Sequence, residues 1–586
     1  MRNATIFTMS LLCFALLSSC SKPAANLVLL NGEVYTMEPS HPWASTVVIT
    51  GNKITAVLDN AEDADGYIGP NTRVVDLKER FAVPGFIDGH VHFNGAGALI
   101  NDANLLTVSD DQGLRVEMQR VVNIIDDEEW ITGGLWGAYE KWALGAAESG
   151  PKRQRRWEPS RWTIDDLTPK NPCLLSSYDG ELFLANTAAL KAAGLENARL
   201  PGMKLDSTRL PTGLIYRGSP ALEKIRSVVK RKSHNRLLDE NRAALKRLAE
   251  SGIVEVHDIA RPEQTARFVE LQENGELTCR VWLRPDLSRG AELKEKGLQM
   301  GLHPKTKKPD HWLRYGALKG YVDGIMGTHG ALFFKPYDDQ PDNYGHYRRH
   351  TSDDPELKIG NMDKLYHLIK IGYDAGFVAN VHAIGTKGVA LLLDTYERLM
   401  KELGKNLEGF RVIHAQVVRQ EDFPRFKKLN IIAEVNPYHL SDDMRWMEER
   451  IGHERCKGAY AFKSLLDNGA ILSFGSDWPG TSAAEYLVHP KYLINAAVNR
   501  TTLNGTPEGG WFPEQKISVH EALKAYTINN AYAAFEDDIR GSIKAGKLAD
   551  ITVCNLNLMK IDPSDILKMN VDITIVDGKI VFEREK

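Results

Sequence analysis

The chain has 586 residues, of which 43% are hydrophobic and 26% are charged, and its formal net charge is −4. This composition excludes global disorder, and the slight acidic excess argues against a nucleic-acid partner. The length suits three or four ordinary domains, or one large α/β barrel that carries additional domains.

The N-terminus has the features of a bacterial lipoprotein signal. Arg2 precedes an apolar run from Ile6 to Leu17, which is too short to span a bilayer but suits the apolar core of a secretory signal. Leu17 is followed by Ser18, Ser19 and Cys20, and cleavage before Cys20 would leave its thiol as the lipid attachment point. We therefore expect residues 1–19 to be a signal peptide. The mature protein is expected to be lipid-anchored in the cell envelope, with its globular part in the periplasm or at the cell surface. A buried N-terminal helix with an incidental cysteine is the alternative.

Short β segments dominate both ends of the chain. Residues 27–30, 45–49, 54–57 and 73–76 have the composition of strands and are separated by turns, and the same texture returns at 550–553 and 572–582. This spacing predicts one β-sandwich domain assembled from residues 20–83 and 536–586.

The central region alternates apolar strands with amphipathic helices. A helix over 236–250 precedes a strand at 253–256, and further strands are predicted at 377–381, 410–413 and 470–474, with helices at 389–402 and about 420–428. This alternation favours a parallel sheet, and residues 84–94 plus 213–535 suit a (β/α)8 barrel. The stretch 95–212 is too long for one loop and holds the tryptophans 130, 136, 142, 157 and 162, so we expect an inserted cap domain.

The cysteines outside the signal give no sign of a disulfide framework. They are Cys173, Cys279, Cys456 and Cys554, and their spacing shows no pairing. We interpret them as ordinary, partly buried residues. The basic run 152–156 is interpreted as a solvated loop of the cap, not as a nucleic-acid patch.

Histidines and one acid gather at predicted strand ends. His90 and His92 are two residues apart after an apolar strand, so both would point to one face, as a divalent metal site requires. His382 and His414 each end another predicted strand, and Asp477 follows a third. A lone histidine in such a place is more often a satisfied core residue. Here four histidines and an acid all lie at the strand ends where α/β barrels place their catalytic residues, and this favours a shared metal site.

Six stretches in this order resemble the metal-dependent amidohydrolase superfamily, and specifically its amidohydrolase-3 or YtcJ-like branch. They are residues 84–92, 318–324, 381–385, 413–416, 474–479 and 541–550. The resemblance implies a TIM-like (β/α)8 barrel flanked by the composite β-sandwich. It also implies that Lys319 is carboxylated by CO2, giving a carbamate that bridges two cations. A surface or salt-bridged Lys319 is the alternative.

The resemblance further implies a set of site residues. The metal ligands would be His90, His92, Lys319, His382 and His414, holding one or two divalent ions, with zinc favoured. Asp477 would be the general base and acid that accepts a proton from the metal-activated water and passes it to the leaving nitrogen, the alternative being a turn or N-cap residue. His439 would orient the substrate carbonyl or serve the structure, and His329 would be a second substrate contact or a loop histidine without a role.

Three positions depart from the family pattern, namely Glu181, Arg217 and Thr386. Since the metal ligands are kept and residues on the substrate side are not, we expect hydrolysis, and no particular substrate is carried over from the family. The prediction is a hydrolase that cleaves a non-peptide C–N bond in a small amide, cyclic imide or N-acyl compound. Ester hydrolysis at the same site and a catalytically inactive solute-binding lipoprotein are the alternatives, and a homodimer stays open.

Overall fold

The computed structural model describes residues 24–136, 157–177, 180–481, 484–485 and 487–585. The predicted signal peptide, Cys20, Trp142 and the basic run 152–156 lie outside these residues. Within them, no helix combines the length and apolarity that a membrane span requires.

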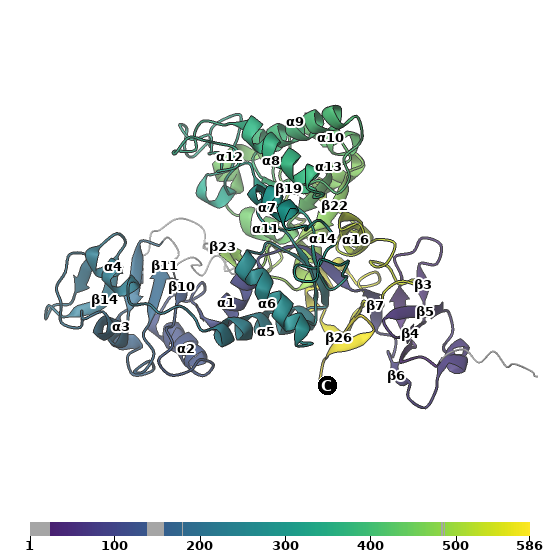
Figure 1. Ribbon diagram of the computed structural model, residues 1–586, viewed down its shortest axis with the longest axis horizontal. Coiled ribbons are helices and arrows are strands. Elements are labelled where there is room, and N and C mark those ends of the chain that lie inside the picture. The colour runs from purple at the N-terminus through teal and green to yellow at the C-terminus, as the bar shows by residue number, and fades with distance from the viewer. Residues whose placement is uncertain (1–23, 137–156, 178–179, 482–483, 486, 586) are drawn as a thin grey trace, which may run out of the picture.

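Two parallel sheets form the centre of the molecule (Figure 1). The first has the order β17-β16-β15-β8, with bounds Leu313–Tyr315, Arg280–Leu283, Ile253–Asp258 and Phe86–Val91. The second has the order β18-β19-β20-β21-β22, with bounds Leu318–Tyr321, Ala379–Ala383, Arg411–His414, Ile432–Val435 and Ile471–Phe474. These strands are buried almost throughout, because helices cover one side and side chains fill the other.

Isolated bridges connect the two sheets at both edges. Asp286, just after β16, bridges to Lys319 of β18, and Val91 of β8 bridges to Trp478, just after β22. Helices join the strands, among them α5 (His234–Glu250), α6 (Pro262–Glu273), α8 (Met362–Asp374), α9 (Thr386–Leu403), α10 (Phe423–Lys428), α11 (Pro437–Asp443) and α13 (Phe462–Asp467). The architecture is a TIM-like α/β fold.

The predicted strands and helices of this region are present, with small shifts at their ends. The helix expected from residue 389 begins at Thr386, where the chain leaves β19, and the helix expected at 420–428 starts as a 3-10 turn over Gln420–Asp422. β8 ends at Val91, so His92 is not a strand residue but the N-cap position of α1 (Phe93–Asn101).

Strands from both chain ends meet in one six-stranded sheet. Its order is β27-β26-β25-β7-β2-β3, with bounds Lys579–Glu583, Val571–Val576, Ile551–Cys554, Phe81–Pro84, Glu33–Tyr35 and Trp43–Ala44. A four-stranded sheet, β5-β4-β1-β6, has bounds Lys53–Leu58, Thr46–Thr50, Leu27–Leu30 and Arg73–Asp76. One apolar cluster contains Leu29 and Val47 of the smaller sheet with Val553 and Ile573 of the larger, so the two sheets pack face to face.

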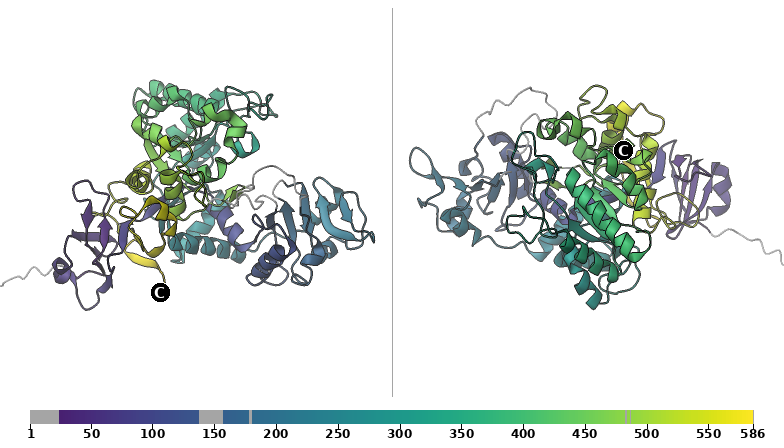
Figure 2. Two further views of the ribbon diagram at one scale, coloured as in Figure 1. Left: turned by 180° about the vertical axis from the view of Figure 1, so that it is seen from behind. Right: turned by 90° about the horizontal axis from the view of Figure 1, so that it is seen from above.

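The residues expected to form a cap contribute most of a further sheet, although its strand β14 runs past residue 212 and α4 follows beyond it. Its order is β13-β14-β12-β11-β10-β9, with bounds Met203–Leu205, Pro211–Tyr216, Leu182–Ala185, Leu174–Ser177, Gly133–Trp136 and Ala103–Asn104. Helices α2 (Asp111–Val122), α3 (Thr187–Ala192) and α4 (Pro220–Arg226) accompany it. Trp130 and Trp136 are buried in its apolar clusters, whereas Trp162 is exposed. This part and the terminal sheets lie on opposite sides of the centre (Figures 1 and 2). The expected domain boundaries themselves stay predictions.

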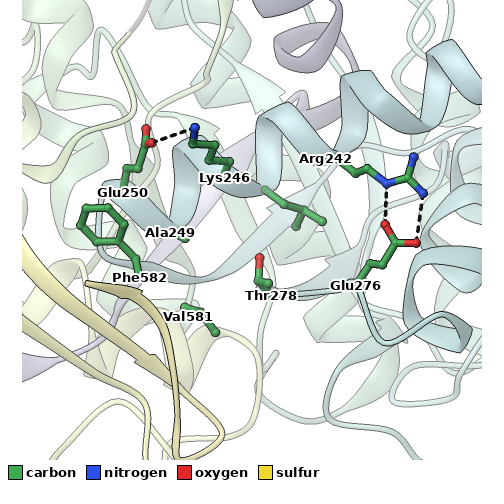
Figure 3. A pocket seen from close by; sticks show the side chains of 9 residues that line it. Arg242, Lys246, Ala249, Glu250, Glu276, Thr278, Val581 and Phe582 are labelled. Carbon is green, nitrogen blue, oxygen red and sulfur yellow. Dashed lines mark hydrogen bonds and ion pairs between the residues drawn. The ribbon is translucent and has the colours of Figure 1, made fainter. Parts of the chain in front are cut away.

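Cys173, Cys279, Cys456 and Cys554 are free thiols, and all four are fully buried, more than the partial burial expected. A cavity of about 330 Å³ lies where α5 meets β27, lined in part by Arg242, Glu276 and Phe582 (Figure 3). None of the predicted site residues lines it.

Candidate metal centre

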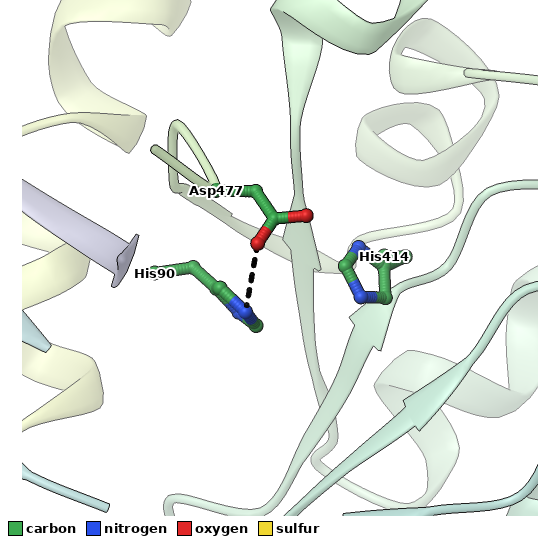
Figure 4. Close-up of side chains that lie close together, drawn as sticks. All are labelled: His90, His414 and Asp477. Carbon is green, nitrogen blue, oxygen red and sulfur yellow. Dashed lines mark ion pairs between the residues drawn. The ribbon is translucent and has the colours of Figure 1, made fainter. Parts of the chain in front are cut away.

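His90, His414 and Asp477 converge at the carboxyl ends of the central strands. One ligand atom from each of these buried residues lies within 4.8 Å of those of the other two (Figure 4). His90 is in β8, His414 ends β20, and Asp477 follows β22. His414 and Asp477 have positive φ angles, 74° and 58°, which non-glycine residues adopt uncommonly.

Hydrogen bonds behind the rings decide which nitrogens face this centre. His90 Nδ1 lies 2.6 Å from Glu434 Oε1, and His414 Nδ1 lies 2.7 Å from Asn436 Oδ1, whose own amide donates to Gly475 O at 2.9 Å. Because both oxygens are acceptors, each Nδ1 carries the proton, and each Nε2 presents a lone pair. His90 Nε2 is buried and, within the described part of the chain, has no hydrogen-bond partner.

His382 and His92 lie beside this cluster. The His382 ring packs edge-on against the His414 ring, 4.5 Å between centroids, and its Nε2 lies 3.3 Å from Gly324 O. That carbonyl can only accept, so Nδ1 of His382 bears the lone pair. His92 Nε2 is 3.2 Å from Asp477 Oδ1, and the His92 side chain is 41% exposed. Although His92 lies beyond β8, it still reaches the centre.

Burial keeps these imidazoles neutral. It lowers the pKa of His90 and of His382 well below the usual value, and that of His414 to about 3. Neutral imidazole is the form that binds metal ions. For Asp477 burial alone would raise the pKa, but the surrounding imidazoles, including the hydrogen bond from His92, hold it well below its usual value. Asp477 is therefore an anion beside the unprotonated Nε2 atoms of His90 and His414, an arrangement that a bound cation would stabilise.

Lys319 is buried on β18 in the same neighbourhood. Burial, reinforced by the charge of Arg284, lowers the pKa of Lys319 to about 7. Its ammonium lies 4.8 Å from the centroid of the Tyr321 ring. A surface position for Lys319 is thus not observed, and the lowered pKa makes the neutral amine accessible near neutral pH.

The structure brings His439 to the centre but not His329. His439, on α11, is buried, with Nε2 3.5 Å from Asp477 Oδ2 and its ring stacked on that of His414. Burial lowers the pKa of His439 to about 4. His329 contacts Asp339 at 2.7 Å and the Tyr337 ring, within its own loop.

The three departures from the family pattern lie in two places. Arg217 and Glu181 form an exposed ion pair with each other at 3.2 Å in the insertion. Thr386 is the first residue of α9, next to Gly385, whose N–H donates to the buried Asp323 carboxylate at 2.9 Å.

Sequence reasoning missed the buried charges that orient His90. Glu434, on β21, accepts from Arg284 at 2.8 Å and from Arg411 at 3.0 Å, and all three side chains are fully buried. Arg284 also donates to Gly89 O at 2.8 Å. The only sequence signal was the presence of charged residues in or beside strongly apolar strands, which is rare unless the charges are paired.

Comparisons with known proteins agree over nearly the whole chain. The model of a family described as the amidohydrolase family matches residues 73–582. Protein LONG AFTER FAR-RED 3 of Arabidopsis thaliana is 31% identical, over 97% of this chain and 94% of its own length. Putative amidohydrolase YtcJ of Bacillus subtilis is 26% identical, over 94% of this chain and 98% of its own length. N-substituted formamide deformylase of Arthrobacter pascens is 24% identical, over 95% of this chain and 98% of its own length.

A solved structure shares the fold. It is that of an uncharacterized metal-dependent hydrolase from Pyrococcus horikoshii, with a TM-score of 0.69 and 22% sequence identity, covering 92% of this chain and 99% of the other.

Proposed function

The chain belongs to the amidohydrolase family, and on that premise we propose that it is a metal-dependent hydrolase that cleaves a C–N bond in a small amide-type substrate. Membership confirms the resemblance to the YtcJ-like branch. The choice of a C–N bond over an ester bond is supported by the relative named N-substituted formamide deformylase.

The observation that carries the proposal is the convergence of His90, His414 and Asp477. Two neutral imidazoles with outward lone pairs and one carboxylate suit a divalent cation with nitrogen and oxygen ligands, zinc above all. His92 and His382 are close enough to complete the set. The hydrogen bonds from Nδ1 of His90 and His414 fix both rings in the orientation that ligation through Nε2 requires.

Held by these residues, a divalent cation would lower the pKa of a bound water from 15.7 to about 7 and would polarise the scissile carbonyl. Asp477, ionised because its pKa is depressed, accepts the proton of the attacking water and delivers it to the leaving nitrogen. His439, 3.5 Å from Asp477 and neutral, is positioned to donate a hydrogen bond to the substrate oxygen.

Lys319 supplies a further ligand in this proposal. Its neutral amine would add CO2 and lose one proton, giving an N-carboxylate whose oxygens could ligate one or two divalent cations. A pKa of about 7 provides the neutral amine that this addition needs. Enriched 13CO2 should give a carbamate carbon signal in the metal-loaded protein and not in Lys319→Ala. A bare amine with a single metal would contradict the two-metal version.

Metal analysis together with a hydrolysis screen tests the function. The purified protein should hold one or two equivalents of zinc, lose activity with a chelator and regain it when zinc is added. The screen covers N-acyl amino acids, formamides, cyclic imides and esters. If the purified protein held no metal and were not stabilised by added zinc, the proposal of a metal-dependent hydrolase would be refuted.

We also propose that the protein is anchored to the envelope through Cys20, on the sequence pattern of residues 2–20. In a bacterial host, the wild-type chain should label with palmitate and sediment with membranes, whereas Cys20→Ser should not. If the wild-type chain and Cys20→Ser were divided equally between the membrane and soluble fractions, the lipid anchor at Cys20 would be contradicted.

A further inference from the structure

Lys319 and Arg348 both lie close to one aromatic ring. The Lys319 ammonium is 4.8 Å, and the Arg348 guanidinium carbon 5.1 Å, from the centroid of the Tyr321 ring. The same ring lies 5.5 Å from the ring of His382. Arg348 is therefore next to the side of the centre that holds two of the proposed ligands.

The backbone of Arg348 is fixed to the end of β18. Tyr347 forms an antiparallel bridge with Asp323, and Arg348 N–H donates to Val322 O and to Thr351 Oγ1, both at 3.1 Å. Tyr347 is buried, and Arg348, which is next in the chain, is only partly buried. The backbone of Arg348 is thus fixed beside the centre, and the residue keeps part of its surface exposed.

This guanidinium has no acidic partner in the described part of the chain, where no carboxylate lies within 4.0 Å of it. The neighbouring acids are occupied. Asp286 accepts from Ser288 at 2.6 Å and contacts His350 at 3.2 Å, while Asp323 accepts from the N–H groups of Leu332, Ile384 and Gly385. The charge of Arg348 also contributes to the lowered pKa of Lys319 and of His382, so it acts electrostatically on the centre.

A cation held here without a counterion suits the binding of an anion. The guanidinium is always charged, and its planar fork matches a carboxylate through two parallel hydrogen bonds. Elsewhere in the chain, buried arginines such as Arg284 and Arg280 have their carboxylates built in. Arg348 lies against an aromatic ring instead, and the residue is only partly buried.

We propose that Arg348 binds a carboxylate group of the substrate, so that the preferred substrates are N-acyl amino acids or similar acids with the carboxylate close to the scissile C–N bond. This inference rests on the proposed function and names the substrate class of the same site.

Matched pairs of substrates test it. Each N-formyl or N-acetyl amino acid is compared with its decarboxylated analogue, for example N-formylphenylalanine with N-formylphenethylamine. We expect zinc-loaded wild-type protein to have the higher kcat/KM on the acid. Arg348→Gln should lower kcat/KM on the acid about 10- to 100-fold, mainly through KM, and change the neutral analogue less than twofold. Arg348→Lys, which keeps the charge but not the fork, should fall between.

Arg349→Gln is the matched control, because Arg349 is the next residue and is exposed. It should keep the wild-type preference. A wild-type protein that cleaves the neutral analogue as well as the acid would overturn the inference while leaving C–N hydrolysis intact. Equal losses of Arg348→Gln on both members would also overturn it, since they would indicate a general structural role.

Ligand binding separates this inference from the proposed function. If no member of any pair is hydrolysed, C–N hydrolysis of such compounds fails and thermal unfolding decides about Arg348. Millimolar N-formylphenylalanine should then raise the apparent Tm of wild type and Arg349→Gln but not of Arg348→Gln. No shift, or the same shift in all three, would overturn the inference.

Discussion

Single hydrogen bonds determine the chemistry of the centre at the residue scale. His90 and His414 can each face a cation with Nε2 only because an acceptor, Glu434 or Asn436, holds the proton on Nδ1. The ionised state of Glu434 depends in turn on Arg284 and Arg411: burial would raise its pKa, and these two charges lower it. The tautomer of His90 thus depends on a buried ion network, whereas that of His414 depends on the Asn436 amide.

Asp477→Asn separates metal binding from proton transfer. The four histidines and an amide oxygen in place of the carboxylate remain to bind the metal, so the variant should still hold it. Because the amide cannot accept a proton, kcat should fall by about 10²- to 10⁴-fold. Elemental analysis and kcat on the best substrate of the screen measure both effects. Asp374→Asn, at an exposed carboxylate, is the control. Undiminished turnover would remove Asp477 from the proposed role.

Asp443→Asn should alter the pH dependence of stability. Burial raises the pKa of Asp443 to about 7, although Tyr460 and Gln416 donate to it at 2.6 and 2.8 Å. An unfolded aspartate titrates near 3.9, so between about pH 4 and 7 the folded chain holds a proton that the unfolded chain has lost. Stability from this group therefore falls as pH rises through that window, by up to about 4 kcal/mol.

The asparagine variant cannot ionise, so its apparent Tm relative to wild type should be more favourable at pH 8 than at pH 5. Calorimetry at both pH values measures the difference. Asp467→Asn, at an exposed ion pair with Lys463, should show no such change. The same difference at both pH values would show that Asp443 does not titrate in this way.

At the scale of elements, periodicity predicted what the chain builds locally. The strand ends at His382 and His414 follow from apolar runs that stop at a polar residue, and these runs are β19 and β20. The sheet of the insertion could not be predicted in the same way. Its strands are short, and its ladder pairs residues far apart, such as Gly134 with Ser176. Likewise, no local pattern indicates that Glu434 meets Arg284, 150 residues away.

Buried charges fasten the insertion to α5. Arg236 of α5 pairs with Asp102 and, at 2.6 Å, with Glu129, and it donates to Trp130 O at 3.0 Å. The Arg236 and Asp102 side chains are both only 7% exposed. Since removing one partner of a buried ion pair costs about 3–5 kcal/mol, Arg236→Met should loosen this junction.

Hydrogen exchange should show faster exchange over residues 100–132 in Arg236→Met, with little change in β19–β22. Arg242→Met is the matched control on the same helix: Arg242 pairs with Glu276 at the surface (Figure 3), where such pairs contribute about 1 kcal/mol or less. If both variants showed the same exchange, the Arg236 cluster would not be what holds the insertion to α5.

At the scale of the whole molecule, the centre and the terminal sheets share a buried ion cluster. Arg280 of β16 is fully buried and donates to Asp550, just before β25, at 2.9 and 3.0 Å. It also donates to Asp577, between β26 and β27, at 2.8 Å. The C-terminal strands are thereby bound to a central strand and to β7 at once. The parallel β/α pattern and the similar texture of both ends were predictable, but not this link, because each partner is an ordinary polar residue in its own segment.

Asp550→Asn tests whether this cluster makes the chain unfold as one unit. The variant keeps the shape of the side chain but leaves Arg280 with Asp577 alone, so about 3 kcal/mol of stability should be lost. Calorimetry should show a lower apparent Tm, with the terminal sheets unfolding before the centre. Asp59→Asn, at an exposed contact with His41, should unfold like wild type. If Asp550→Asn kept a single transition at the wild-type Tm, apolar contacts would be what joins the centre to the terminal sheets. The ion pairs of Arg280 would then compensate its buried charge without linking the two parts.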